Sequence, residues 1–162
     1  MRVKRSIVVG VSDMAVSNDV TTELVTYSLG SCLGVVIYDA TVRVGGLLHL
    51  MLPESSIDKK KARECPAMFV DTGVPLLFQR AYQLGANKSR IKLRVVGGAG
   101  ALDEKFFNIG RRNYAALLEI LDHNGVAIHA EAVGGQVSRT IRLDISMGAL
   151  QVYVPGSGKF IL

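Results

Sequence analysis

Short apolar runs separated by glycine-containing turns dominate the pattern of hydrophobic and polar positions along the chain. Runs of about four to eight residues that are rich in β-branched side chains are typical of strands. The pattern predicts strands over residues 5–11, 22–29, 32–38, 44–52, 91–96, 126–133, 139–145 and 149–154. Because only a few turn residues separate the third and fourth runs, we expect these two to form an antiparallel hairpin.

Two segments have apolar positions at the helical period, residues 66–84 and the stretch between Asn108 and Gly125. Pro75 is expected to kink or split the first helix, because proline lacks the backbone N–H that a helix interior needs. Asn108 is a suitable N-cap for the second helix, and Asn124-Gly125 is a suitable end. Many strands, two helices and no regular strand–helix alternation indicate an α+β domain.

We expect residues 1–162 to form a single domain with a mixed, largely antiparallel sheet and the two main helices on one side. Residues 54–65 are polar and contain the run Lys59-Lys60-Lys61, so a mobile surface loop is expected there. Few aromatic residues accompany this run. It therefore gives little support to nucleic-acid binding, which commonly uses aromatic side chains for stacking on bases.

Composition and charge further limit the class of protein and its location in the cell. The chain is 49% hydrophobic and 20% charged, as is ordinary for a soluble globular protein. Its net charge of +5 is as compatible with steering towards an acidic partner as with a basic solvated surface. No stretch approaches the roughly 18 apolar residues of a membrane span, and the first apolar run is too short for a signal peptide. Two cysteines do not make a disulfide framework, so we expect a cytoplasmic protein without membrane insertion.

Cys32 and His49 are the strongest candidates for chemistry. If the hairpin is centred between Ala40 and Thr41, they lie directly opposite each other, close enough for a thiol–imidazole pair. A loop with an odd number of residues would instead place them on opposite faces. A neighbouring imidazolium stabilises a thiolate, and the same histidine can protonate a leaving amine and then activate water.

Three further residues complete this candidate site. Gly30 and Ser31 precede Cys32, and such small residues allow a tight turn that offers backbone N–H groups to an oxyanion. Thr26, on the preceding strand, has a hydroxyl that can orient the histidine. The alternative is that Cys32 is a small buried apolar residue and His49 an ordinary core histidine.

Other features give weaker signals. A zinc site has little support, because Cys32, Cys65, His49, His123 and His129 contain no closely spaced ligand pair. Cys65 is expected to be an incidental thiol. The run Gly97-Gly98-Ala99-Gly100 lacks the full pattern of a phosphate-binding loop, so a tight turn is expected, and Gly134-Gly135 is expected to form a hairpin turn.

The segment Thr26-Tyr-Ser-Leu-Gly-Ser-Cys32, followed by Gly45-Gly46-Leu-Leu-His49-Leu-Met-Leu-Pro53, resembles the CheD family of bacterial chemotaxis proteins. The resemblance covers nearly the whole chain, with further matches at Phe69-Val-Asp71-Thr72, Gly97-Gly98-Ala99, Asn108-Ile-Gly-Arg-Arg-Asn113 and Gly134-Gly135. Two positions depart from the family pattern. Phe69 stands in place of the usual tyrosine, and Gln136 in place of a common asparagine.

The resemblance implies an activity and a set of roles. Family members deamidate glutamines on methyl-accepting chemoreceptors, and some also hydrolyse glutamyl methyl esters. Cys32 would be the nucleophile that forms a thioester, His49 the base and Thr26 the third active-site residue, with no cofactor or metal. A layered α/β sandwich is implied as the fold. Many members bind CheC, a response-regulator phosphatase, so receptor cytoplasmic domains and a CheC-type protein are the expected partners.

We therefore expect a cysteine-dependent protein-glutamine glutaminase. Two alternatives belong to other classes. The chain could be a non-catalytic interaction module that binds and stimulates a CheC-like phosphatase. It could also be a small-ligand domain built on the glycine-rich run that begins at Gly97.

Overall fold

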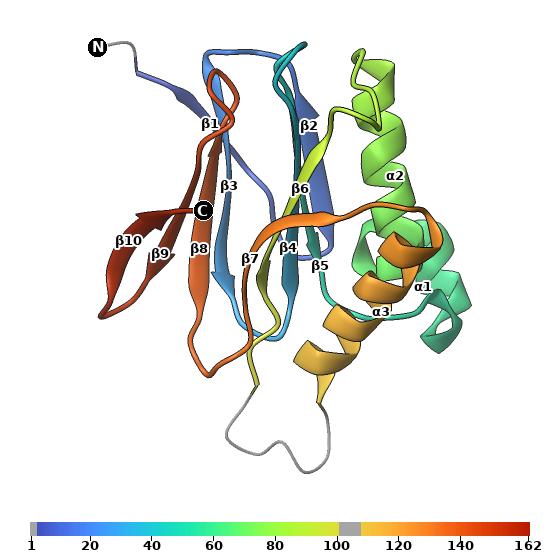
Figure 1. The fold of residues 1–162 in the computed structure, drawn as a ribbon. Helices are drawn as coiled ribbons and strands as arrows, with labels where there is room; N and C mark the ends of the chain where they lie inside the picture. Colours follow the sequence, from blue (N-terminus) through green and yellow to red (C-terminus); the bar gives the residue numbers. More distant parts are fainter. Residues whose placement is uncertain (1–2, 101–107) are drawn as a thin grey trace.

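The computed structural model describes residues 3–100 and 108–162, and the strands of these residues form two five-stranded sheets (Figure 1). The outer sheet has the order β1 (Arg5–Val8), β3 (Thr22–Leu29), β8 (Arg139–Asp144), β9 (Leu150–Val154) and β10 (Gly158–Ile161). The inner sheet has the order β2 (Asp13–Ser17), β5 (Val44–Leu50), β4 (Leu33–Asp39), β6 (Lys92–Gly97) and β7 (Ile128–Val133). Most neighbouring strands are antiparallel, whereas β1–β3 and β6–β7 are parallel.

The helices cover one face of the inner sheet, so the molecule has three layers (Figure 1). Among the described residues they are α1 (Lys59–Glu64), α2 (Val70–Gln83) and α3 (Ile109–His123). Leu48 on β5 and Leu77 on α2 belong to the apolar core between the inner sheet and the helices. Leu47 and Ile141 belong to a second core between the two sheets. The predicted α+β fold, with mixed sheet and two main helices on one side, is confirmed.

The strands β4 and β5 lie in the middle of this arrangement. All seven residues of each strand are buried, because the outer sheet covers one face and the helices cover the other. This explains why the sequence there is an almost continuous apolar run rather than an alternating one. The predicted hairpin is therefore the centre of the fold.

Some predicted elements are wrong in detail. Residues 54–65 are not a loop, because a 3-10 turn (Ser55–Ile57) leads into α1, whose first turn is capped by the carboxylate of Asp58 accepting from Lys61 N–H at 3.0 Å. The predicted helix 66–84 begins as a separate 3-10 turn (Pro66–Met68), and α2 then continues through Pro75. Gly134-Gly135 does not form a hairpin turn but leads from β7 in one sheet to β8 in the other.

The first predicted strand ends early, at Val8, because the chain there crosses from the outer to the inner sheet. Val9 N–H still donates to Val25 O in the outer sheet at 2.7 Å, and Ser12 N–H donates to His49 O in the inner sheet at 2.8 Å. Ser12 has a positive φ of 60°, which turns the chain into β2. Residues 9–12 thus bridge the two sheets beside His49.

Candidate active site

The register of the β4–β5 hairpin differs from the prediction by two residues. Gly34, not Cys32, pairs with His49, so the expected direct opposition of Cys32 and His49 is wrong. The loop has four residues between the paired Asp39 and Val44 rather than two, and its last residue, Arg43, has φ of 51°. A shift of two residues nevertheless preserves the face of each side chain, because side chains alternate with a period of two.

Cys32 and His49 consequently share the end and the face of the hairpin. Cys32 directly precedes β4 and packs against the core between the sheets. His49 is the next-to-last residue of β5, and Leu47, two residues before it, belongs to that same core. Cys32 is partly exposed whereas His49 is 2% exposed. The Cys32 side chain is therefore partly accessible to solvent, whereas the His49 imidazole is not.

Thr26 holds His49 across the interface between the sheets. The Thr26 side chain is fully buried on β3, and its Oγ1 lies 2.7 Å from His49 Nδ1 and 2.7 Å from Val9 O. A carbonyl oxygen only accepts hydrogen bonds, so the single hydroxyl proton of Thr26 is donated to Val9. Thr26 Oγ1 must then accept from Nδ1–H of His49. A neutral His49 therefore carries its lone pair on Nε2.

Burial sets the protonation of both groups. Burial lowers the pKa of His49 from its ordinary value of 6.5. Burial also raises the pKa of the Cys32 thiol from its ordinary value of 9.0, against a smaller lowering by its own backbone N–H. Both shifts disfavour the charged forms. Burial therefore works against a thiolate–imidazolium pair at these two residues.

His49 Nε2 is buried and has no hydrogen-bond partner among the described residues, so Cys32 Sγ does not hydrogen-bond to it in this structure. The structure thus brings Thr26 and His49 into direct contact and places Cys32 on the same face without a bond to either. Hydrogen bonds between catalytic groups are often long in unliganded enzymes and shorten when substrate binds.

The loop before Cys32 is held by its carbonyl groups. Gly30 O accepts from Ala99 N–H at 2.8 Å, and Cys32 O accepts from Gly98 N–H at 2.9 Å. Ser31 O accepts from the side-chain Nδ2 of Asn113 at 3.1 Å. All three carbonyls are thereby directed into the protein. No described residue other than Cys32 itself accepts from the backbone N–H groups of residues 30–32, and the Cys32 N–H faces its own thiol.

The glycine-rich run that begins at Gly97 is structural support for this loop. Gly97 has φ of 114°, and a Cβ atom on it would lie 2.3 Å from Cys32 O, so only glycine fits. The N–H groups of Gly98 and Ala99 bind the Cys32 loop, and that of Gly100 donates to Gly135 O at 2.8 Å. These amides already have partners, so they are not free to bind a phosphate as the small-ligand alternative requires.

The chain was compared with known proteins. Residues 51–154 match the model of a family described as CheD chemotactic sensory transduction. A Syntrophus aciditrophicus protein named probable chemoreceptor glutamine deamidase CheD 1 is 49% identical over 94% of each chain. Proteins named probable chemoreceptor glutamine deamidase CheD from Solibacter usitatus (46% identical; 94% of this chain, 91% of the relative) and Thermococcus kodakarensis (38%; 94% and 95%) are also similar. This chain belongs to the CheD family.

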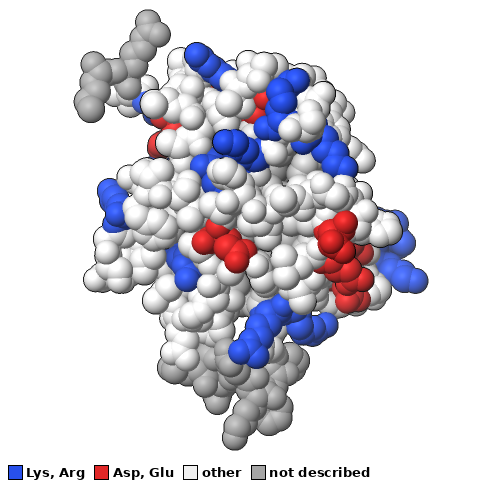
Figure 2. All heavy atoms as spheres, in the orientation of Figure 1, with Lys and Arg blue, Asp and Glu red and all other residues white. Residues whose placement is uncertain are grey.

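The CheD-family site lies at the lower end of the hairpin in Figure 1, near the start of α3. The first turn of α3 carries the exposed Arg111 and Arg112, and neither forms an ion pair with a described residue. Figure 2 shows basic side chains at this end of the molecule. Arginine at a helix N-terminus opposes the helix dipole, so these two residues do not stabilise α3 through its dipole.

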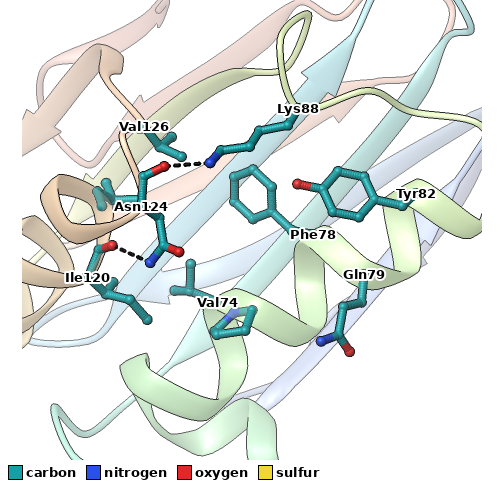
Figure 3. Close-up of a pocket in the computed structure, with 10 residues that line it drawn as sticks. Val74, Phe78, Gln79, Tyr82, Lys88, Ile120, Asn124 and Val126 are labelled. Atoms are coloured by element: carbon teal, nitrogen blue, oxygen red, sulfur yellow. Dashed lines mark hydrogen bonds between the residues drawn. The ribbon is translucent and has the colours of Figure 1, made fainter.

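An apolar pocket elsewhere on this CheD-family chain contains none of the candidate catalytic residues. Figure 3 shows it between α2 and α3, lined by Val74, Phe78 and Tyr82 on one side and Ile120 on the other. Lys88 spans one end and donates to Asn124 O. The residues that line this pocket are therefore different from the residues of the Cys32 site.

The described residues contain neither a cluster of metal ligands nor a membrane-spanning helix. In residues 3–100 and 108–162, no three His, Cys, Asp or Glu side chains are grouped so that they could hold a metal ion. None of the helices that the structure describes has the length and apolar character needed to cross a membrane.

Sequence reasoning missed Asn113 as part of the site. Asn113 ends the motif Asn108-Ile-Gly-Arg-Arg-Asn113 but has no chemistry of its own that would single it out. Only the packing of α3 reveals its contact with Ser31. Asn108 does precede α3 as predicted, yet its side chain makes no capping hydrogen bond.

Proposed function

We propose that this CheD-family chain hydrolyses specific glutamine side chains to glutamate on the cytoplasmic domains of methyl-accepting chemoreceptors. The names of its relatives support the substrate class. The observation that carries the chemistry is the bond between Thr26 and His49 Nδ1, which leaves Nε2 as a buried free base on the face that carries Cys32. Such a base is what a neutral thiol needs to become a nucleophile.

The first half of the reaction transfers the acyl group. His49 Nε2 takes the thiol proton as Cys32 Sγ attacks the side-chain carbonyl carbon of the glutamine. The backbone N–H groups of Ser31 and Cys32 hold the resulting oxyanion, since no other described residue accepts from them and the Cys32 N–H already faces the reacting sulfur. His49 then returns the proton to the amide nitrogen. Ammonia leaves, and a γ-glutamyl thioester remains on Cys32.

The second half releases the product. His49 Nε2 takes a proton from water, and the oxygen attacks the thioester carbon. The tetrahedral intermediate collapses, the proton returns to the sulfur of Cys32, and glutamate is formed. Thr26 positions the ring throughout, because its link to Val9 O keeps Nδ1 protonated and Nε2 available. No cofactor takes part in this scheme.

The same scheme extends to glutamyl methyl esters. Attack by Cys32 on an ester gives the same thioester, with methanol in place of ammonia as the leaving group. An ester is the easier acyl donor, so esterase activity requires no further residue. Arg111 and Arg112, which are exposed near the site and form no ion pair with a described residue, favour a substrate glutamine whose neighbours are acidic.

We propose a cytoplasmic location, where the receptor domains lie and where thiols stay reduced; Cys32 and Cys65 are both free. A CheC-type phosphatase is proposed as a binding partner on the family resemblance. The alternative, a non-catalytic module for such a partner, gives no reason for a buried threonine to fix the tautomer of a histidine behind an accessible thiol.

The test uses the purified chain and a receptor cytoplasmic fragment from the same organism. Conversion of glutamine to glutamate is mapped by peptide mass spectrometry, with Cys32→Ala and Cys65→Ala in parallel. We expect conversion by the wild type and Cys65→Ala but not by Cys32→Ala. Full activity of Cys32→Ala would contradict the nucleophile, and no conversion by the wild type would favour the interaction module, which a CheC pull-down would then test.

A further inference from the structure

Asn113 is fully buried on α3 and binds two backbone carbonyls with one amide nitrogen. Its Nδ2 donates to Ser31 O at 3.1 Å and to Met51 O at 3.1 Å. Ser31 directly precedes Cys32, and Met51 follows His49 by two residues. A single side chain therefore joins the two arms of the hairpin at the end where the thiol and the imidazole lie.

The bond to Ser31 O fixes the direction of a possible oxyanion donor. Ser31 C=O and Cys32 N–H belong to the same peptide unit, and in a planar trans peptide these two groups point in opposite directions. Because Asn113 draws the carbonyl into the protein, the Cys32 N–H points away from α3. This N–H also faces the thiol of its own residue, whose pKa it lowers. The second bond, to Met51, fixes the amide to the end of β5.

The packing of α3 makes this contact rigid. Gly110 lies so close to the glycine-rich segment that a Cβ atom on it would be 2.6 Å from Gly98 O and 2.6 Å from Ala99 O. Gly98 and Ala99 are the residues whose N–H groups hold the other two carbonyls of the Cys32 loop. α3 and the glycine-rich segment thus pack together and jointly hold the three carbonyl groups of the Cys32 loop.

The chemistry of Asn113 matches this use. Two carbonyl oxygens must be bound by one short side chain, and an amide NH₂ supplies two donors from one atom. Its Oδ1 is buried without a partner among the described residues. A buried polar atom without a partner is unfavourable, so the residue is not explained by stability alone. Its two donated bonds account for it.

We propose that Asn113 is a positioning residue for the deamidation, and that its amide aims the Cys32 N–H at the oxyanion. The proposal rests on the proposed function. It predicts a defect in deamidation that alkylation of the same thiol does not share. Alkylation of Cys32 by iodoacetamide displaces iodide without forming an oxyanion, whereas attack on a glutamine forms one. Loss of the amide should therefore slow deamidation much more than alkylation.

The test compares Asn113→Leu with the wild type on the receptor fragment. We expect kcat to fall about 100-fold, the loss typical of one oxyanion donor, with KM unchanged. The alkylation rate of Cys32 should stay within about 3-fold, since the thiol and His49 are retained. A parallel fall of both rates would indicate general disruption of the loop and would overturn the proposal.

Asn124→Leu is the control, because Asn124 directly follows the C-terminal end of α3 and its Nδ2 also donates to a backbone carbonyl, Ile120 O, at 2.8 Å. This variant should behave as the wild type. If the thermal melting curve shows that Asn113→Leu does not fold, Asn113→Ala replaces it. The same ratio of the deamidation rate to the alkylation rate is expected for this variant. Wild-type kcat in a folded Asn113 variant would overturn the positioning role alone. An inactive wild type, or an active Cys32→Ala, would instead overturn the proposed function.

Discussion

Thr26 Oγ1 and His49 Nδ1 lie 2.7 Å apart although they come from different sheets. The bond crosses the core between the sheets, and neither residue has appreciable exposure to solvent. Since Thr26 donates its only proton to Val9 O, the direction of the bond is determined and so is the tautomer of the histidine. The tautomer of a histidine on the inner sheet is thus set by a hydroxyl from the outer sheet.

Thr26→Val should lower the deamidation rate by about 10–100-fold, because valine keeps the shape of threonine but cannot hold Nδ1 protonated. The rate is measured on the receptor fragment as kcat/KM. Thr22→Val is the control, since Thr22 is equally buried on β3 and makes no hydrogen bond to His49. Equal activity of both variants would contradict the role of Thr26.

The pH dependence of deamidation should follow the neutral form of His49. Its pKa lies below 6.5, so the base is neutral and active above that value and is lost only as the pH falls further. The raised pKa of Cys32 keeps the thiol protonated through neutral pH. We expect a rate that rises in the acid range and is level from about pH 7 to pH 8. A tenfold rise per pH unit across that range would show that free thiolate is the reacting species.

Gly97→Ala should both destabilise the chain and displace the nucleophile loop. Its Cβ would lie 2.3 Å from Cys32 O, at a φ of 114° that alanine rarely adopts. Gly158→Ala is the control, since Gly158 also has a positive φ, 89°, but has no atom within 4 Å of the added Cβ. The melting temperature and the alkylation rate of Cys32 should change markedly in the first variant. Gly158→Ala should lower the free energy of unfolding only by the cost of backbone strain, about 1–2 kcal/mol.

Asp39→Ala should lower the free energy of unfolding by about 2–4 kcal/mol, because it removes a buried carboxylate that accepts hydrogen bonds from three residues. The Asp39 carboxylate accepts from Thr41 N–H at 3.0 Å, from Asn87 N–H at 2.9 Å and from Arg90 Nη2 at 3.0 Å. Urea denaturation measures the loss. For comparison, Asp58→Ala removes the N-cap at the exposed start of α1 and should lower the free energy of unfolding by about 1 kcal/mol.

Asp39 should also link stability to pH. Burial raises its pKa, but the bonds from Arg90, Asn87 and Thr41 outweigh burial and hold the pKa below its ordinary value of 3.8. The contribution of this lowered pKa is fully present above that value and is lost as the pH falls through the folded-state pKa. The wild type should therefore lose stability relative to Asp39→Ala below about pH 4.

Reversal of charge at Arg111 and Arg112, both to Glu, should raise KM about 10-fold on an acidic receptor fragment and leave kcat unchanged. The effect should diminish at high salt, where exposed charges are screened. The same double change at Lys59 and Lys60 on α1 is the control for net charge. Equal effects of the two pairs would mean that overall charge, rather than the site, attracts the substrate.

The sequence predicts the central features of the site and misses its register. The apolar runs on both sides of residues 40–43 identify the hairpin. The observed register differs from the predicted one by two residues, an even number, so Cys32 and His49 still lie on one face. The loop length depends on Asp39 and on Arg43 at φ of 51°, and no pattern of apolar residues encodes these. The prediction was therefore right about the face and wrong about the opposed residues.

The division into two sheets was not predictable in the same way. Strands β2 and β10 are short, so neither gives an apolar run long enough to predict a strand, and they lie at the edges of the sheets, paired with β5 and β9. Asn113 was missed for a similar reason. Its two carbonyl partners lie 82 and 62 positions away in sequence, and only the packed helix brings them together.

The crossing of residues 9–12 between the sheets has a consequence for the newly made chain. Thr26 can orient His49 only after β3 has packed against β5, and β3 is held in the outer sheet by β8, which is synthesised more than 100 residues later. The two residues of this contact are thus only 23 positions apart in sequence, whereas the outer sheet that holds Thr26 is completed by strands from the last quarter of the chain.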